Sequence, residues 1–585
     1  MDKNMKTFLL SDIIAANRDI GKKLIREKKY QIVILSNITC TPIKDILEYC
    51  LRREGINAYV HFGNYDNIVQ EAVIYKKSNL VIIFWELANI TEGFHYKSNI
   101  LGKEEIDHIV KNIQSDIDSV FSALGETSLV LFNTFSSAVF NSMSIENAPF
   151  DTICEDLNDY VMKMAHRNVK IIDIDKILMQ NSVVRSVDFR YFYSSKALYS
   201  LDFLKSYVEF IKPIIMSANG RSKKALIFDC DNTLWKGIVG EEGFDGIECS
   251  EKTKGGSIFQ EVQYIALELN KRGIILGLCS KNNPDDVMNI LKNHPGMTLN
   301  EQHFTIMKLN WKDKVSNLRE IAQELNIGLD SLVFIDDSDF EINYVRRNLP
   351  EITVVQVPKK ISDYPQVMRR LTTLFFNLSS SIEDFSKIEM YQQQFQREDQ
   401  RKKFGTTDDY LRSLGIIVSV TVNDVSQIER IAQLTQKTNQ FNLTTKRYTE
   451  SDIKKFMDNE NNLVITFGVE DRFGGYGLTG LCIICCNQSD RSSTIDSFLM
   501  SCRIIGRNIE LAFFDYLISL LKKRNIHFLR TIYLETRKNV QVELFYEKIG
   551  CELIKATDNE KIYCLKLNKY IPQHIDYIKI FQNEV

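Results

Sequence analysis

One short stretch of this sequence constrains the fold most strongly, an apolar run that ends in two aspartates. The run extends from Ala225 to Phe228 and continues directly into Asp229-Cys230-Asp231. A run of this length bounded by charge predicts a buried strand of a parallel sheet, and such strands present the following residues at the carboxyl edge, where ligands bind. Two carboxylates two residues apart at a strand end can hold a Mg²⁺ ion and offer an oxygen as a nucleophile to phosphorus.

A second predicted strand of the same region is followed by residues suited to an anion. Ser280, Lys281 and Asn282 come directly after the apolar run 274–279, and Pro284 opens a helix behind them. A hydroxyl and the free amides of a helix start can cradle a phosphate oxygen, since helix N-termini attract anions. The same amides also serve an ordinary N-cap, so the residues alone leave both interpretations open.

A third and a fourth predicted strand add a cation and a second pair of acids. The strand predicted at 303–307 precedes a helix with Lys312 and Lys314 near its start, and a lysine there can neutralise a phosphoryl group. The strand predicted at 331–335 ends in Asp336-Asp337. Carboxylates at the same sheet edge as the first aspartate pair would complete the oxygen shell of a Mg²⁺ ion.

The spacing between these strand ends leaves no room for a large cap domain. Between Asp231 and Ser280 lie 48 residues, 232 to 279, and between Ser280 and Lys314 lie 33, 281 to 313. The glycine-punctuated stretch 237–256 predicts a hairpin flap over the site. An uncapped site cannot sequester a small substrate by itself, so we expect a lid from another domain or a macromolecular partner.

The N-terminal part, residues 1–218, alternates strand candidates with helix-length segments, which predicts a doubly wound parallel sheet. The strand candidates are 31–35, 58–62, 80–85, 128–132 and 169–172. The layout resembles the SGNH hydrolases, with Ser36 at the end of the first strand. No histidine occurs from 167 to 293, so Ser36 has no evident imidazole to accept its proton. We therefore expect a binding or docking domain rather than an esterase.

The C-terminal part is predicted as a polar helical connector at 376–403, a third α/β domain at 404–568 and a tail at 569–585. Its strands and helices, with Arg503-Ile-Ile-Gly-Arg-Asn508 between a strand and a helix, resemble GNAT acyltransferases, whose corresponding loop holds a pyrophosphate on a helix N-terminus. Asn508 adds a side chain where the backbone would approach phosphate, so the expected ligand is a pantetheine arm rather than acyl-CoA. The predicted pantetheine-binding residues are Asn439, Asn442, Arg503, Gly506 and Arg507.

Several motifs together carry a resemblance to one family. Asp229-x-Asp231-x-Thr233 matches the first motif of the haloacid dehalogenase (HAD) superfamily, and the continuation through Leu-Trp to Gly-Ile-Val-Gly-Glu-Glu-Gly resembles its FkbH-like branch. Further marks at 434–445, 471–474 and 498–503 extend the resemblance over nearly the whole chain. It implies an α/β protein of three domains: a flavodoxin- or SGNH-like doubly wound sheet (1–218), a HAD-type Rossmann-like core without a large cap (219–375) and a GNAT-like α/β domain (404–568).

The resemblance also implies a role for each matching residue. Asp229 would be the nucleophile and Asp231 the general acid/base. The implied phosphate and substrate ligands are Thr233, Ser280, Lys281, Asn282 and Lys314, which the resemblance favours over Lys312. The implied Mg²⁺ ligands are Asp229, Asp231, Asp336 and Asp337. Cys279 is the candidate for an enzyme thioester, and a buried strand-end thiol is the alternative.

In FkbH-like proteins the implied substrate is 1,3-bisphosphoglycerate, from which a glyceryl group passes to the phosphopantetheine thiol of an acyl carrier protein. The expected function is thus that of a Mg²⁺-dependent phosphoryl-processing enzyme with a carrier protein as partner. Three alternatives are open. One is a phosphomonoesterase acting on a carbohydrate or secondary-metabolite intermediate, one is a GNAT-type acyltransferase whose HAD domain is a scaffold, and one is an assembly platform without catalysis.

Composition limits the partners and the compartment. Lys and Arg number 73 against 76 Asp and Glu, a formal charge of -3, so there is no basic excess to neutralise a nucleic acid backbone. The longest apolar runs, 80–85 and 478–486, are too short to span a bilayer, and no signal-peptide core opens the sequence. The 12 cysteines in so long a chain fit reduced core thiols. We expect a cytoplasmic protein without nucleic acid or membrane partners.

Overall fold

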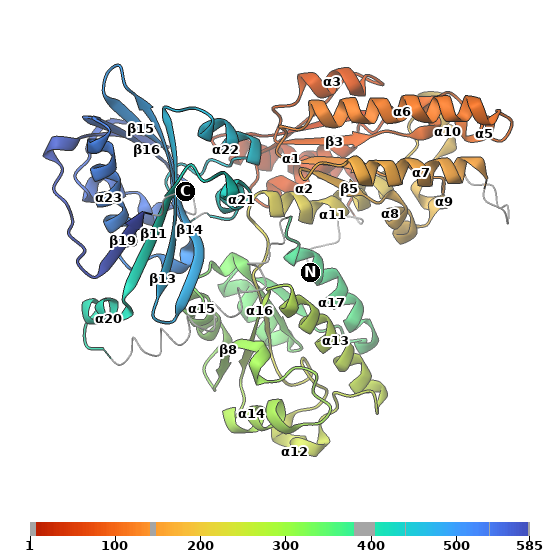
Figure 1. Ribbon diagram of the computed structural model, residues 1–585. Helices are drawn as coiled ribbons and strands as arrows, with labels where there is room; N and C mark the ends of the chain where they lie inside the picture. The colour runs from red at the N-terminus through yellow and green to blue at the C-terminus, as the bar shows by residue number, and fades with distance from the viewer. Residues whose placement is uncertain are drawn as a thin grey trace. The chain divides into compact units, whose positions relative to one another are not determined.

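The computed structural model describes residues 8–140, 148–378, 404–438, 440–536, 539–557 and 559–582. The chain divides into two compact units, Met1–Ile215 and Met216–Val585. The described residues form three sheets, one in the first unit and two in the second (Figure 1). This arrangement confirms the predicted α/β class with parallel sheets.

The first sheet has the strand order β2-β1-β3-β4-β5, and all neighbouring strands are parallel. Its strands are β1 Tyr30–Ser36, β2 Ala58–Phe62, β3 Leu80–Phe84, β4 Val130–Asn133 and β5 Val169–Ile172. The central strand β3 is buried along its whole length, as expected for a parallel strand covered by helices on both faces. The doubly wound sheet predicted for this part is therefore present, with strands within two residues of the predicted bounds.

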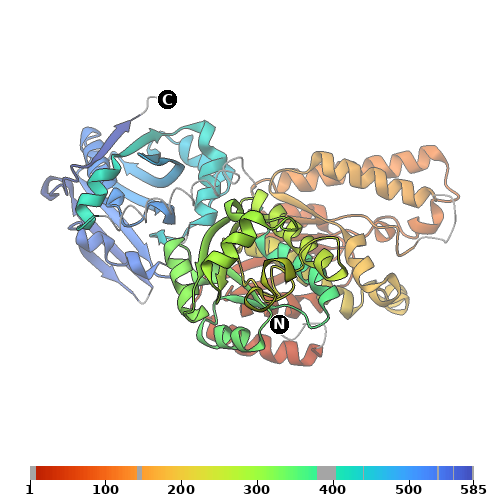
Figure 2. The ribbon, with the colours of Figure 1, turned by 90° about the horizontal axis from the view of Figure 1, so that it is seen from below.

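Eleven helices accompany this sheet in the described residues. They are α1 Leu10–Lys23, α2 Ile43–Arg53, α3 Ile68–Ile74, α4 Leu87–Ile90, α5 Phe94–Lys97, α6 Lys103–Ala123, α7 Pro149–Met164, α8 Ile174–Asn181, α9 Val183–Ser186, α10 Phe189–Ser195 and α11 Leu201–Ala218. The long helices α6 and α7 lie side by side in both Figure 1 and Figure 2. Their apolar faces bury Ile117, Val120 and Leu157 in one core with the sheet.

The second sheet is also parallel and has the order β10-β9-β6-β7-β8. Its strands are β6 Ala225–Phe228, β7 Ile275–Ser280, β8 Phe304–Leu309, β9 Leu332–Asp336 and β10 Thr353–Gln356. The chain runs outward from β6 to β8 and then returns to place β9 on the other side of β6. This reversal next to β6 creates a topological switch point, where open α/β sheets bind ligands.

The helices of the second sheet are α12 Val239–Gly246, α13 Lys254–Lys271, α14 Pro284–Asn293, α15 Lys314–Glu324, α16 Asp339–Asn348 and α17 Tyr364–Thr372. The fully described segment between β6 and β7 contains α12 and α13, and that between β7 and β8 contains α14, so no large cap is inserted there. The predicted hairpin flap is wrong in detail. An antiparallel bridge joins Lys236 and Glu248 at its two ends, but α12 between them is a helix kinked at Gly243 rather than a strand.

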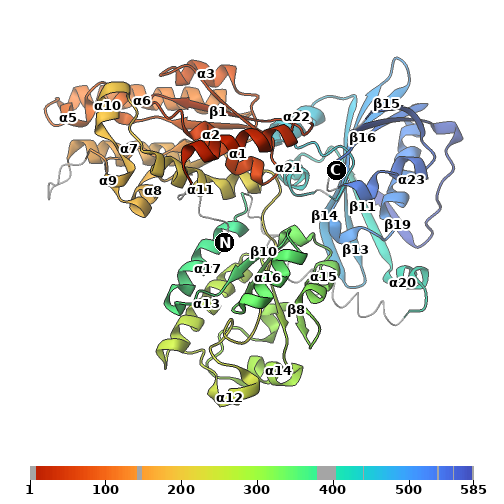
Figure 3. The same ribbon diagram turned by 180° about the vertical axis from the view of Figure 1, so that it is seen from behind.

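The third sheet is mixed and has nine strands, in the order β17-β18-β16-β15-β14-β13-β11-β19, with β12 paired to β15 off this path. Its strands are β11 Ile416–Val422, β12 Phe441–Asn442, β13 Asn462–Asp471, β14 Gly474–Asn487, β15 Ser492–Met500, β16 Phe528–Leu534, β17 Glu552–Ala556, β18 Glu560–Lys566 and β19 Ile578–Gln582. The helices are α20 Thr407–Leu414, α21 Ile428–Lys437, α22 Glu450–Met457, α23 Ile509–Lys523 and α24 Phe545–Lys548. Figure 3 shows α23 along one face of this sheet.

The C-terminal part departs from the predicted tail and leaves the predicted connector mostly outside the described residues. The tail predicted at 569–585 is wrong for Ile578–Gln582, because these residues form β19 and pair in parallel with β11. An edge strand formed so late in the sequence can be recognised only from its pairing partner. The connector predicted at 376–403 lies outside the described residues, apart from 376–378. Among the described residues, no helix combines the length and apolar character needed to cross a bilayer.

Candidate active site

Three aspartates converge where β6 and β9 end. Asp229 continues the parallel pairing of these strands, since its backbone N–H donates to the Ile335 carbonyl over 2.9 Å. Asp336 is the last residue of β9, and Asp337 follows it. Carboxylate oxygens from Asp229, Asp336 and Asp337 all lie within 4.8 Å of one another. We call these three residues the acid cluster.

Lys314 supplies the opposite charge to the acid cluster. It is the first residue of α15 and only 4% exposed, and its Nζ lies 2.9 Å from Asp229 Oδ1 and 2.5 Å from Asp336 Oδ2. Lys312, the alternative, is exposed and pairs instead with Glu320 at 3.3 Å. The structure therefore brings Lys314, and not Lys312, to the strand ends that carry the acids.

Burial and charge together shift the pKa values of the acid cluster and Lys314. Burial raises the pKa of Asp229 above its usual value, while the Lys314 ammonium acts in the opposite direction. Burial also raises the pKa of Asp337, and repulsion from Asp229 adds to this effect. Burial alone would lower the pKa of Lys314, but attraction to Asp229 and Asp336 outweighs it. One buried ammonium thus faces three carboxylates, which leaves an excess of negative charge for a further cation.

The donor set of the acid cluster fits Mg²⁺. Hard divalent cations in proteins prefer carboxylate oxygens, and Mg²⁺ is usually held by one or two carboxylates together with substrate phosphate. Asp229, Asp336 and Asp337 offer such oxygens on the rim of one sheet. The residues present therefore satisfy the requirement for a magnesium site, with room in the coordination shell for a phosphate oxygen.

The carboxylate of Asp231 lies apart from this group, which corrects its prediction as a side-chain metal ligand. Its Oδ1 accepts hydrogen bonds from the Trp235 indole N–H over 3.0 Å and from the Val239 backbone N–H over 3.1 Å. Its Oδ2 accepts one from the Asn282 amide over 2.9 Å. The physical reason is local: the turn after β6, the start of α12 and Asn282 supply N–H donors that already occupy both oxygens of this carboxylate.

The other predicted phosphate ligands surround the same strand ends. Ser280 ends β7, is 2% exposed, and its hydrogen bond lowers the pKa of Asp229. Asn282 is committed to Asp231, so its amide is less available to phosphate than predicted. The ammonium of Lys281 pairs with Glu341 Oε1 at 2.6 Å. Thr233 is fully buried, and its hydroxyl has no hydrogen-bond partner in the described part of the chain.

Cys279 is not placed for catalysis, which corrects its prediction as the thioester residue. It precedes Ser280 on β7, and alternation along the strand turns it away from Ser280 into an apolar core with Ile306 and Leu318. It has no exposed surface, and burial raises the pKa of its thiol well above the usual range. A thiol must ionise to act as a nucleophile, so this environment favours the structural alternative.

Replacing Cys279 by alanine is therefore expected to leave Mg²⁺-dependent turnover within about threefold of the wild-type rate, with a stability loss of about 1 kcal/mol from the lost core contacts. Steady-state kinetics and a thermal unfolding scan of Cys279→Ala measure both effects. Loss of turnover, together with an acyl adduct on Cys279 in the wild-type protein, would restore the thioester role.

The pantetheine-binding residues predicted in the third sheet are only partly available. Arg507 is 6% exposed, forms an ion pair with Asp471 at 3.2 Å and donates to the Tyr476 hydroxyl, so it is a structural residue and its predicted ligand role is wrong. The prediction that the Asn442 side chain binds a ligand is also wrong. It has no exposed surface, its amide donates to the Thr438 carbonyl, and its oxygen accepts from Thr445 N over 2.8 Å.

The structure does not bring the remaining predicted residues together into one site, and it does not exclude them as ligands. Arg503 Nε donates to the Ser501 hydroxyl over 3.2 Å. Gly506 is exposed at φ +81°, with open space where a Cβ would lie. Asn508 adopts a left-handed conformation, φ 62°, at the start of α23. Asn439 lies outside the described residues.

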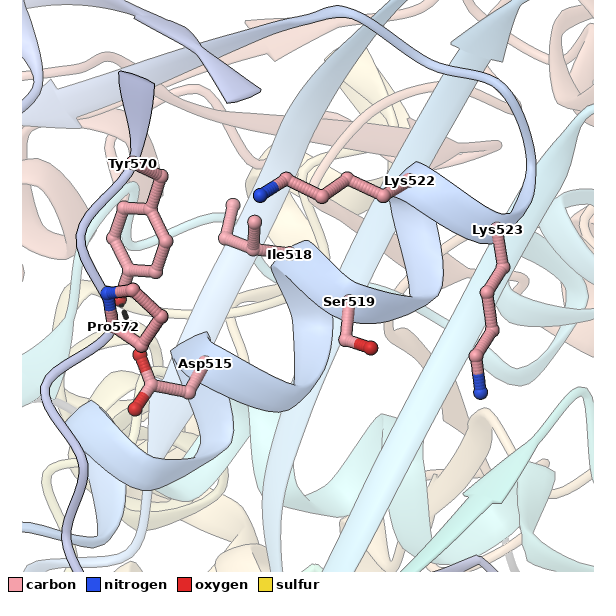
Figure 4. A pocket seen from close by; sticks show the side chains of 7 residues that line it. All are labelled: Asp515, Ile518, Ser519, Lys522, Lys523, Tyr570 and Pro572. Atoms are coloured by element: carbon pink, nitrogen blue, oxygen red, sulfur yellow. Dashed lines mark hydrogen bonds between the residues drawn. The ribbon is translucent and has the colours of Figure 1, made fainter. Parts of the chain in front are cut away.

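A hollow of about 480 Å³ lies on the third sheet's helix α23, away from the strands that carry the acid cluster (Figure 4). Its lining residues are Asp515, Ile518, Ser519, Lys522, Lys523, Tyr570 and Pro572. The Asp515 carboxylate already accepts hydrogen bonds from the Tyr570 hydroxyl over 2.6 Å and from the Gln573 backbone over 3.0 Å. In Figure 4 Lys523 points away from Tyr570. Because the Asp515 carboxylate is already hydrogen-bonded within the protein, we assign no chemistry to this hollow.

The first sheet presents several polar side chains at its carboxyl edge. The Ser36 hydroxyl donates to the Ile38 carbonyl over 2.9 Å, which agrees with the expectation that it is not a nucleophile. Asn37 exchanges hydrogen bonds with the backbone of Glu86 over 2.9 and 2.7 Å. Burial raises the pKa of Glu86 to about 7, and the Ser136 hydroxyl donates to Asp175. Glu86 and Asp175 could not be identified from the sequence, since they follow strand ends without a motif.

Known proteins give a limited comparison with this chain. No family model matches the sequence, and no curated protein matches it. One similar solved structure is the N-terminal part of a Bacteroides fragilis protein containing a phosphatase domain, complexed with Mg. The two are 24% identical with a TM-score of 0.54, and the match covers 64% of this chain and 100% of that chain. At this identity the similarity shows the fold alone.

Two acetyltransferases illustrate the weaker matches, each covering 26% of this chain. The ribosomal-protein-S18-alanine N-acetyltransferase of Escherichia coli is 14% identical with a TM-score of 0.21, over 94% of that chain. A spermidine N-acetyltransferase mutant from Vibrio cholerae is 14% identical with a TM-score of 0.22, over 96% of that chain. Scores this low carry no argument about the third sheet. The fold and the acid cluster together define a multidomain α/β protein whose second, parallel sheet carries buried carboxylates and a lysine at its switch point.

Proposed function

We propose that this protein is a Mg²⁺-dependent phosphoryl-processing enzyme of the FkbH-like type. The observation that carries the proposal is the convergence of Asp229, Asp336, Asp337 and Lys314 at the switch point of the second sheet. Acids and a buried ammonium at one strand edge are the elements that phosphoryl transfer requires. The Mg complex of the similar Bacteroides fragilis structure supports the same metal.

Asp229, Asp231 and Lys314 each have a separate role in the proposed reaction. Mg²⁺ bound by the acid cluster would offset the repulsion between a phosphate group and the Asp229 carboxylate. An oxygen of Asp229 attacks phosphorus, the bond to the leaving oxygen breaks, and an aspartyl-phosphate forms. Asp231 gives a proton to the leaving oxygen and later takes one from the water that releases phosphate. Lys314 holds the transferring group by its charge.

For the substrate we propose 1,3-bisphosphoglycerate, with the glyceryl group passing to the phosphopantetheine thiol of an acyl carrier protein. This donor has an acyl phosphate at one end and a phosphate ester at the other, and a glyceryl thioester has neither. The thiol sulfur would attack the acyl carbon and displace phosphate, while the Asp229 and Asp231 chemistry would remove the ester phosphate. Because Cys279 is buried, the proposal has the carrier thiol attack directly.

Intact mass spectrometry of the carrier tests this proposal. The protein is incubated with Mg²⁺, 1,3-bisphosphoglycerate and a holo carrier protein, and the carrier is expected to gain one glyceryl group. The matched control is the apo carrier, which lacks the thiol and should stay unchanged. Release of free phosphate with an unchanged holo carrier would contradict carrier loading and favour the phosphomonoesterase.

The acyltransferase alternative makes a different prediction. If the third sheet were the catalytic domain, transfer would not depend on the acid cluster. The buried ion pair of Arg507 removes one ligand of the loop on which that alternative relied. We therefore place the chemistry in the second sheet, and a binding role for the third sheet remains part of the proposal through Arg503 and Gly506.

A further inference from the structure

The side-chain carboxylate of Asp231 is held by several hydrogen bonds. Three N–H donors reach it: Trp235 Nε1 and Val239 N on Oδ1, at 3.0 and 3.1 Å, and Asn282 Nδ2 on Oδ2, at 2.9 Å. Two of these donors are side chains, from the turn after β6 and from the chain after β7. The carboxylate is therefore fixed from two separate strands.

The donors themselves cannot easily move. Trp235 has no exposed surface and packs in the apolar core of this sheet. The turn that carries it is fastened by two buried groups. The Tyr364 hydroxyl donates to the Thr233 carbonyl over 3.0 Å, and the Gln263 amide donates to the Leu234 carbonyl over 2.9 Å. An indole held in this way sets the direction of the Asp231 carboxylate rather than following it.

The pattern of hydrogen bonds distinguishes the two oxygens of Asp231. A carboxylate offers about four lone-pair sites, two on each oxygen. Both sites on Oδ1 are used by Trp235 and Val239, whereas Oδ2 accepts one bond from Asn282. Among the described residues, one site on Oδ2 is thus left open. Oδ2 is therefore the oxygen of Asp231 that can meet a further group.

We propose that Trp235 and Asn282 are positioning residues for Asp231, which present its Oδ2 toward the leaving group. Both residues would act through the Asp231 carboxylate, and neither role follows from the phosphate-binding assignment made for Asn282 from the sequence. The inference rests on the proposed function, because it needs Asp231 to act as the general acid. It adds that the acid donates its proton most effectively when these two donors fix its orientation.

The dependence of rate on the leaving group tests this inference. Phenyl phosphate and p-nitrophenyl phosphate have nearly the same shape, but the phenolate leaving group is more basic and depends more on proton donation. In Trp235→Phe and Asn282→Leu, which lack the donor N–H, the kcat for phenyl phosphate should fall about tenfold further than that for p-nitrophenyl phosphate.

The matched control is Tyr364→Phe, which loosens the same turn without removing a bond to Asp231. It should change both rates by the same factor. Equal losses for both probes in Trp235→Phe and Asn282→Leu would overturn the positioning role while leaving the proposed function intact. Wild-type protein that hydrolyses neither probe with Mg²⁺ would overturn the inference, whereas the carrier-loading assay with 1,3-bisphosphoglycerate decides the proposed function separately. Should Trp235→Phe fail to fold, Asn282→Leu decides the question alone.

Discussion

Replacing Asp229 by asparagine is expected to lower Mg²⁺-dependent phosphate release by about a thousandfold or more, because the amide cannot attack phosphorus. The substitution keeps the shape of the side chain at a site that is 6% exposed, so the fold should persist. It also removes one of the three carboxylates of the acid cluster and weakens the metal site. Steady-state release of phosphate from the donor is the measurement.

The control for this variant is Asp286→Asn, which makes the same chemical change on the exposed start of α14. It should retain wild-type turnover, since its carboxylate takes no part in the acid cluster. If Asp229→Asn kept more than about a tenth of the wild-type rate, the acyltransferase alternative, in which the second sheet is a scaffold, would be favoured.

Removal of the Lys314 ammonium is expected to have the largest effect on stability. Lys314→Met leaves Asp229 and Asp336 buried without their cation, and breaking a buried ion pair typically costs about 3–5 kcal/mol. Added Mg²⁺ should restore part of this loss, because a bound cation replaces the missing positive charge. Urea unfolding followed by tryptophan fluorescence measures it, since Trp235 and Trp311 lie in this part of the chain.

Lys312→Met serves as the control, because its side chain is 64% exposed and exposed ion pairs contribute about 0–1 kcal/mol. Its unfolding midpoint should stay close to that of the wild type, with and without Mg²⁺. A Lys314→Met protein as stable as the wild type, or one that Mg²⁺ stabilises no more than the wild type, would count against a shared cation site at the acid cluster.

Much of the second sheet could be predicted, because each of its strands corresponds to a short local pattern in the sequence. Short apolar runs followed by polar residues identify parallel strands, and parallel strands deliver their following residues to one edge. Asp229, Asp336 and Lys314 come together for this reason. The environment of Cys279 could also have been anticipated, since side chains alternate along a strand and its neighbour Ser280 faces the site.

Other features depend on contacts between distant parts of the chain, which a sequence pattern does not record. Arg507 looked like an anion ligand, but Asp471, 36 residues earlier, holds it in a buried ion pair. Residues 578–582 form the strand β19 because they pair with β11 at the edge of the third sheet. The contact between Trp235 and Asp231 spans only four residues, but the turn that allows it is held by Tyr364 and Gln263 from distant parts of the chain.

The central claim is tested most directly by locating the phosphoryl group on the protein during turnover. The wild-type protein is mixed with Mg²⁺ and a phosphorylated donor, quenched in acid and digested, and the peptides are weighed. We expect one phosphoryl group on the peptide that contains Asp229, and none when Asp229 is replaced by asparagine. Turnover that proceeds without any phosphoryl group on that peptide would contradict the account.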